Sequence, residues 1–61
     1  MQKPYEAAAM YEKAQELSPA DADLAYQAAL WFKRAGDVAK ARENATKAKM
    51  LGHEGGKELL G

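Results

Sequence analysis

The fold is decided by residues 22–51, whose sequence is ADLAYQAALWFKRAGDVAKARENATKAKML. On both sides of Gly36-Asp37, apolar residues recur at steps of three and four, which is the pattern of amphipathic helices. Gly36 is expected to be the C-cap of the first helix, and Asp37 the N-cap of the second. Because the turn between them is so short, the two helices are predicted to form an antiparallel hairpin.

The first helix of this hairpin carries two apolar stripes, whereas a surface helix usually carries one. The stripes consist of Leu24, Ala28, Trp31 and Ala35 on one side and of Ala25, Ala29 and Phe32 on the other. A helix that is apolar over so wide an arc should pack between two neighbours and form the centre of the molecule. Asp21 is its expected N-cap, and Asp23 lies favourably in its first turn, near the positive end of the helix dipole.

Residues 4–18 are predicted to form another helix before the hairpin. Pro4 suits a first helical turn, where its missing N–H is not needed. Pro19 pushes Ser18 out of the helical region and so ends the helix. The apolar face is expected to hold the residues at helical spacing, namely Ala7, Met10, Tyr11, Ala14 and Leu17.

The second helix of the hairpin is predicted to run from about Val38 to Leu51, with Gly52 as its C-cap. Its apolar face is expected to hold Val38, Ala41, Ala45, Ala48 and Leu51. The Gly55-Gly56 pair that follows disfavours helix, while residues 57–60 could form a short, frayed turn. Leu59 and Leu60 could pack back onto the helices or belong to a further helix. Residues 1–61 are therefore predicted to form one all-α domain of three main helices and a short C-terminal turn or helix.

An internal period of 34 residues relates the first of these helices to the third. The identical pairs are Ala7 and Ala41, Lys13 and Lys47, Ala14 and Ala48, and Leu17 and Leu51. This spacing is typical of helix–turn–helix arrays that serve as recognition scaffolds.

In this register, residues 22–54 resemble one tetratricopeptide repeat (TPR), a pair of antiparallel helices with small residues where the backbones approach closely. Ala29 and Phe32 match the small and aromatic positions of the family's first helix, and Ala41 and Ala48 match the small positions of its second. The second helix of a preceding repeat is matched by Ala7, Tyr11, Ala14 and Pro19. The chain departs from the family at Ala25 and Ala45, where large aromatic residues are common, and at His53, where Pro is usual.

The resemblance implies one and a half repeats, in the order second helix, first helix, second helix. About three repeats are usually needed for a stable array, because each buries its apolar face on a neighbour. Three alternatives follow: a fragment of a longer array, a self-associating unit, or a minimal three-helix bundle.

The resemblance also implies a protein–protein interaction scaffold, because the first helices of such repeats line a concave surface that holds a peptide. The positions that would face this surface are Asp23, Tyr26, Gln27, Leu30 and Lys33, with Arg34 at its edge. Tyr26 and Leu30 lie one turn apart, outside the core stripes, and could form an apolar platform between Asp23 and Lys33. In the alternative interpretation, Tyr26 and Leu30 pack on another helix or on a second copy, and the chain is purely structural.

Composition argues against several other classes of function. The net charge is zero, so a nucleic-acid binder is not expected, although Lys40, Arg42, Lys47 and Lys49 give residues 38–51 a basic face. Without Cys, and with His53 as the only His, no metal site is expected. No nucleophile–base set or phosphate loop is present, so neither an enzyme nor a cofactor is expected. There is no membrane-spanning run and no signal-peptide pattern, which leaves the cytoplasm as the default location.

Overall fold

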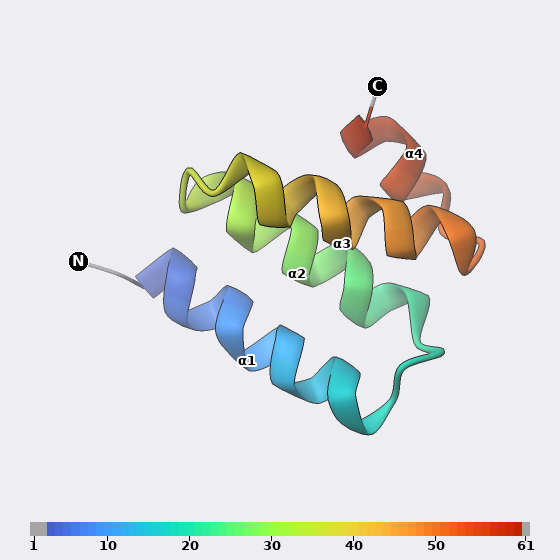
Figure 1. Cartoon of the computed structure of the whole chain (residues 1–61), viewed down its shortest axis with the longest axis horizontal. Coiled ribbons are helices and arrows are strands. Elements are labelled where there is room, and N and C mark those ends of the chain that lie inside the picture. Colours follow the sequence, from blue (N-terminus) through green and yellow to red (C-terminus); the bar gives the residue numbers. More distant parts are fainter. Residues whose placement is uncertain (1–2, 61) are drawn as a thin grey trace.

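The computed structural model describes residues 3–60, and its four elements in that range are all α-helices (Figure 1). They are α1 (Lys3–Leu17), α2 (Ala22–Arg34), α3 (Val38–Met50) and α4 (Glu54–Leu60). Helix α2 is the centre of the molecule, since α1, α3 and α4 all pack against it. Within residues 3–60, the predictions of an all-α fold and of a central second helix are confirmed.

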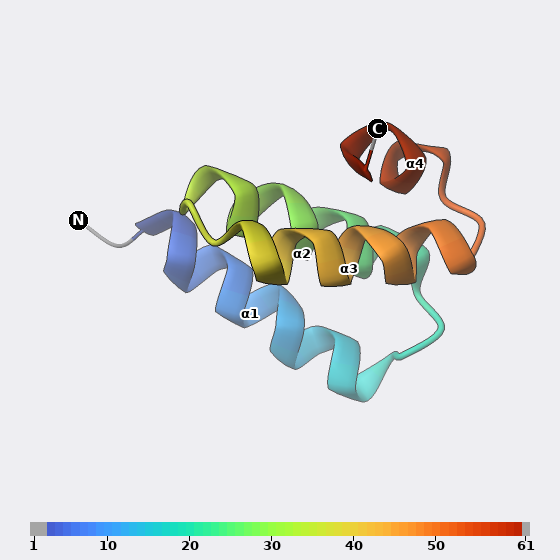
Figure 2. The same ribbon diagram turned by 45° about the horizontal axis from the view of Figure 1, so that its top comes forward.

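Helices α1 and α3 pack on α2 without packing along each other. Figures 1 and 2 both show that their backbones diverge toward Leu17, the end of α1. Helix α4 crosses the end of α3 and also touches α2.

Two aspartates begin the helices of the hairpin. The Oδ1 atom of Asp21 accepts hydrogen bonds from the backbone N–H groups of Asp23 at 3.0 Å and Leu24 at 3.4 Å. The Oδ1 atom of Asp37 accepts one from the backbone N–H of Lys40 at 3.1 Å. These bonds satisfy N–H groups that have no partner within the helix, so both predicted N-caps are confirmed.

Helices α2 and α3 end in the same way. Gly36 and Gly52 adopt positive φ angles of 86° and 97°, which residues with a side chain rarely adopt. The next N–H in each turn then reaches back to the helix, from Asp37 to the Phe32 carbonyl and from His53 to the Ala48 carbonyl, both at 2.9 Å. Each turn is a Schellman motif, as the two glycines predicted.

The core is built from small side chains. Among the described residues, Phe32 is the only large side chain that is fully buried. The other buried apolar residues are Ala8, Ala25, Ala28, Ala29, Ala41, Ala45 and Ala48. The ring of Tyr5 packs edge-on against Phe32, with 5.8 Å between the ring centroids. The helices are therefore held by close approach of their backbones around one fully buried aromatic ring, with Tyr5, Tyr11 and Trp31 packed at its edges.

Some residues predicted to lie on apolar faces are exposed instead. Met10 is 73% exposed and Leu17 is 86% exposed, because α2 is the only described helix that packs along α1 and it covers a narrow strip. That strip is centred on Ala8, which the spacing argument did not select. Val38 and Leu51, at the two ends of the predicted apolar face of α3, are also exposed.

The prediction that Gly55-Gly56 disfavours helix is wrong. Both residues lie in the first turns of α4. A Cβ atom on Gly56 would lie 2.7 Å from the Ala45 carbonyl oxygen and 2.7 Å from the Lys49 backbone nitrogen, so only glycine lets α4 approach α3 this closely. The contact with α3 therefore outweighs the weak helix propensity of the pair.

Candidate protein-binding surface

The residues predicted to bind a partner fall on two sides of α2. At about 100° per residue, Asp23, Gln27, Leu30 and Arg34 project from one side, which we call the outer row. Asp23 and Arg34 are exposed, while Gln27 and Leu30 are half-buried. The outer row faces away from Phe32, so the core packing leaves it partly open.

The end of the outer row carries an aromatic–cation pair. The Arg34 guanidinium carbon lies 5.0 Å from the centre of the Trp31 ring, within the range of a cation–π interaction. Trp31 is half-buried against the core cluster. This contact positions the Arg34 guanidinium, whose planar fork of N–H donors matches a carboxylate.

The other two predicted residues, Tyr26 and Lys33, lie on the side of α2 that faces α4. The Tyr26 ring stacks on the His53 ring, with 4.3 Å between centroids and 14° between planes. A Cβ atom on Gly55 would clash with the Tyr26 ring. Lys33 is exposed and lines a small cavity of about 230 Å³ together with Leu59 of α4. Tyr26 is thus occupied by the contact with α4, and the predicted platform of Tyr26 and Leu30 is divided.

His53 has a role that the sequence interpretation missed. Its Nδ1 atom accepts a hydrogen bond from the Gly55 backbone N–H at 2.9 Å, which makes His53 a cap at the start of α4. Because Nδ1 accepts, the proton of the neutral ring is assigned to Nε2, which lies 3.1 Å from Asp23 Oδ1 and can donate to it. The signal was present in the sequence, since Gly52-His53 follows α3 as Gly36-Asp37 follows α2.

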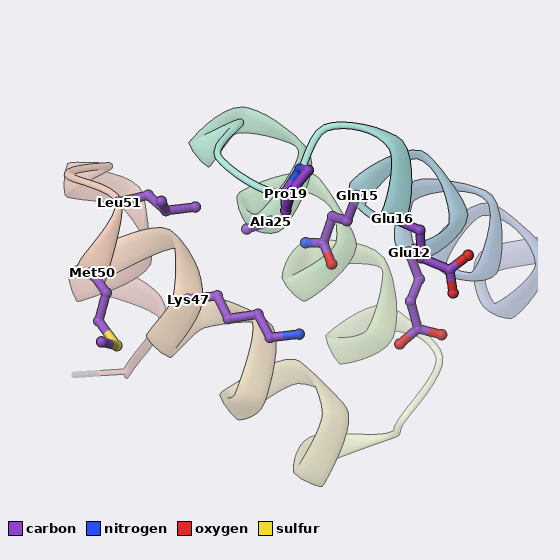
Figure 3. A pocket seen from close by; sticks show the side chains of 8 residues that line it. All are labelled: Glu12, Gln15, Glu16, Pro19, Ala25, Lys47, Met50 and Leu51. Carbon is purple, nitrogen blue, oxygen red and sulfur yellow. The ribbon is translucent and has the colours of Figure 1, made fainter.

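A groove of about 580 Å³ opens between α1 and α3 (Figure 3). Ala25 of α2 lines it, together with residues from the C-terminal halves of α1 and α3. Figure 3 shows the Lys47 side chain extending from α3 toward the α1 side of this groove. The sequence did not predict the groove because it depends on the divergence of two helices that are far apart in the chain.

Two further findings concern the described residues. Within residues 3–60, no three His, Cys, Asp or Glu side chains are grouped closely enough to hold a metal ion. No helix in the same range has both the length and the apolar character needed to cross a membrane.

Comparisons of the chain with models of protein families, with curated protein sequences and with solved structures found no match. The TPR resemblance therefore stays a prediction.

Proposed function

We propose that the chain is a TPR-like helical unit that binds a peptide or a partner protein through the outer row of α2. The observation that carries this proposal is the partial exposure of the row on a helix against which α1, α3 and α4 all pack. An open strip on an otherwise enclosed helix is a rigid platform, and rigid platforms lower the entropic cost of binding.

The dimensions and charges of the outer row favour a short extended peptide. Asp23 and Arg34 are eleven positions apart, so their backbones are separated by roughly 16 Å at 1.5 Å per residue. An extended peptide covers that distance with about five residues. We expect a basic residue of the peptide at Asp23, an acidic residue or a terminal carboxylate at Arg34, and an apolar side chain on Leu30.

The contact between α2 and α4 reduces the set of residues that are available to a partner. Tyr26 stacks on His53, so we assign it to holding α4 in place and not to the partner. The Asp23 side chain remains 83% exposed although it accepts from His53, so it can also accept from a ligand. The proposed contacts with the partner are therefore Asp23, Gln27, Leu30 and Arg34.

Selection from a random peptide library, followed by affinity measurements on variants, tests the proposal. We expect the selected peptides to share an acidic group, and Arg34→Glu to weaken their binding about tenfold or more by placing like charges together. Arg42→Glu makes the same charge change on an exposed residue of α3 and is the matched control. Equal affinity of wild type and Arg34→Glu, with helicity retained in both, would contradict the proposal, as would an equal loss in the control.

Self-association is a second candidate, favoured by exposed apolar side chains outside the outer row. Met10, Leu17 and Met50 are 73%, 86% and 81% exposed. Burying these side chains between two copies would release their apolar surface from water. Sedimentation equilibrium of the wild-type chain decides this point, because a monomer across a wide concentration range rules out the assembly.

A further inference from the structure

The groove between α1 and α3 is separate from the proposed peptide site. Ala25, which lines the groove from α2, is about 200° around that helix from Asp23 of the outer row. A ligand in the groove and a peptide on the outer row would therefore lie on opposite sides of α2. The two sites can be tested independently.

Half of the groove's lining residues are apolar, and the other half are Glu12, Gln15, Glu16 and Lys47. Pro19, Ala25, Met50 and Leu51 are among its lining residues and come from three different segments of the chain. Met50 is 81% exposed, although its side chain is one of the largest apolar groups of α3. An apolar side chain of a ligand that entered the groove would pack against Met50, and both side chains would then be shielded from water.

The two walls of the groove carry opposite charges. Glu12 and Glu16 line the α1 wall, and Lys47 lines the α3 wall (Figure 3). Glu12 already has a partner, because the Lys40 ammonium lies 3.6 Å from its carboxylate. Within residues 3–60, no ion pair involves Glu16 or Lys47. The groove therefore presents one available charge of each sign, Glu16 on the α1 wall and Lys47 on the α3 wall. The Gln15 amide nitrogen, which also lines the groove, is buried without a hydrogen-bond partner within residues 3–60.

We propose that this groove is a second docking site, and that it binds an amphipathic helix of a partner protein. The partner helix would insert an apolar ridge at helical spacing between the walls. A basic residue on one flank would face Glu16, and an acidic residue on the other flank would face Lys47. This surface is additional to the outer row of α2 and does not depend on the peptide site.

Three synthetic peptides that differ only in their flanks are suitable probes. Each is Ala-based and about 15 residues long, the length at which such peptides become helical in water, with Leu residues on one face. One has Lys on one flank and Glu on the other, one has Lys on both, and one has Glu on both. Reversing a helix in the groove exchanges its two flanks, so the mixed peptide can match the two walls in one of its two directions. The uniform peptides cannot match both walls in either direction, so they are the comparison for the mixed peptide.

Affinities for the labelled peptides are measured by fluorescence anisotropy. We expect wild type to prefer the mixed peptide about threefold over either uniform one, as partly exposed charge pairs are weak. Met50→Gln should weaken binding about tenfold by removing an apolar contact. Met10→Gln is the matched control on an exposed methionine outside the groove.

Charge reversal on the α3 wall gives the stricter test. Lys47→Glu should make the peptide with Lys on both flanks bind most tightly, because both walls are then acidic. Lys49→Glu changes the same charge in the same helical turn outside the groove and should leave the order unchanged. The proposal is overturned if no peptide binds, if the order survives Lys47→Glu, or if Met50→Gln has no effect. It is also overturned if the chain dimerises and Met50→Gln dissociates the dimer, since the occupant is then a second copy.

Discussion

Replacing Gly56 with Ala sets two opposite effects against each other. In an open helical position, Ala stabilises a helix by about 0.8–1.0 kcal/mol relative to Gly. At Gly56, however, the added methyl would lie 2.7 Å from two backbone atoms of α3 and 3.0 Å from the Ala48 Cβ. Backbone atoms cannot rotate away, so either α4 shifts outward or the contact is lost.

We expect the steric effect to be the larger one. Forcing an extra carbon into a closely packed contact typically costs about 1–3 kcal/mol. After the gain in helix propensity is subtracted, Gly56→Ala should weaken the docking of α4 by about 1 kcal/mol. The loss has an upper limit, because it cannot exceed the free energy with which α4 docks on α3 and α2.

Hydrogen exchange measured by NMR follows this local opening. The backbone amide of residue 56, which donates to the His53 carbonyl at 3.1 Å in the wild-type chain, reports on α4. Its protection should fall about fivefold, whereas amides in α2 should keep theirs. Lys57 is exposed on α4, so comparing Lys57→Ala with Lys57→Gly measures the propensity effect without the contact. The difference in α4 protection between Lys57→Ala and Lys57→Gly gives the gain expected from helix propensity alone. If Gly56→Ala raises the protection of α4 by that same amount, the close approach of α4 to α3 has no energetic consequence, which would refute the prediction.

Three further substitutions test other parts of the structure. His53→Ala removes a cap and a stacked ring, so α4 should lose about 1–3 kcal/mol of docking free energy by hydrogen exchange. His53→Asn should restore the cap alone, and equal losses in the two variants would argue against capping. Asn44→Leu should leave the free energy of unfolding in urea unchanged or raise it by up to about 1 kcal/mol, because Asn44 is 2% exposed and its Oδ1 atom has no partner within residues 3–60. A clear loss would mean that Oδ1 is satisfied in solution. Phe32→Ala should cost about 3–5 kcal/mol in thermal unfolding, while Leu17→Ala on the surface should change stability by less than about 0.5 kcal/mol. Similar effects at the two positions would contradict the assignment of the core.

Local chemistry explains which parts of the fold were predictable. Asp21 and Asp37 cap helices through neighbouring N–H groups, and Gly36 ends a helix through its own backbone angles. Such features depend on a few adjacent residues and can be read directly. The central position of α2 was also predictable, because its two apolar stripes require two neighbours.

Features that depend on tertiary contacts were not predictable in the same way. Helical spacing assigned Met10 to an apolar face, but spacing does not say how many helices cover that face. Gly56 was interpreted from its propensity, whereas its position is decided by the α3 backbone beside it. In the candidate site, Tyr26 is covered by the ring of His53, which lies in the turn between α3 and α4. This contact divides a surface that looked continuous in the sequence.

The alanine-rich core has a consequence for the heat capacity of the protein. Unfolding exposes apolar surface, which raises the heat capacity, and peptide groups, which lower it. Average proteins would give a chain of 61 residues a change of about 0.7–0.9 kcal/mol/K. Alanine methyl groups are small compared with the peptide groups that are buried beside them. We therefore expect the heat-capacity change of unfolding of this chain to lie toward the lower end of that range. Its stability curve is then shallow, so the fold is modestly stable over a wide range of temperature and unfolds over a broad interval.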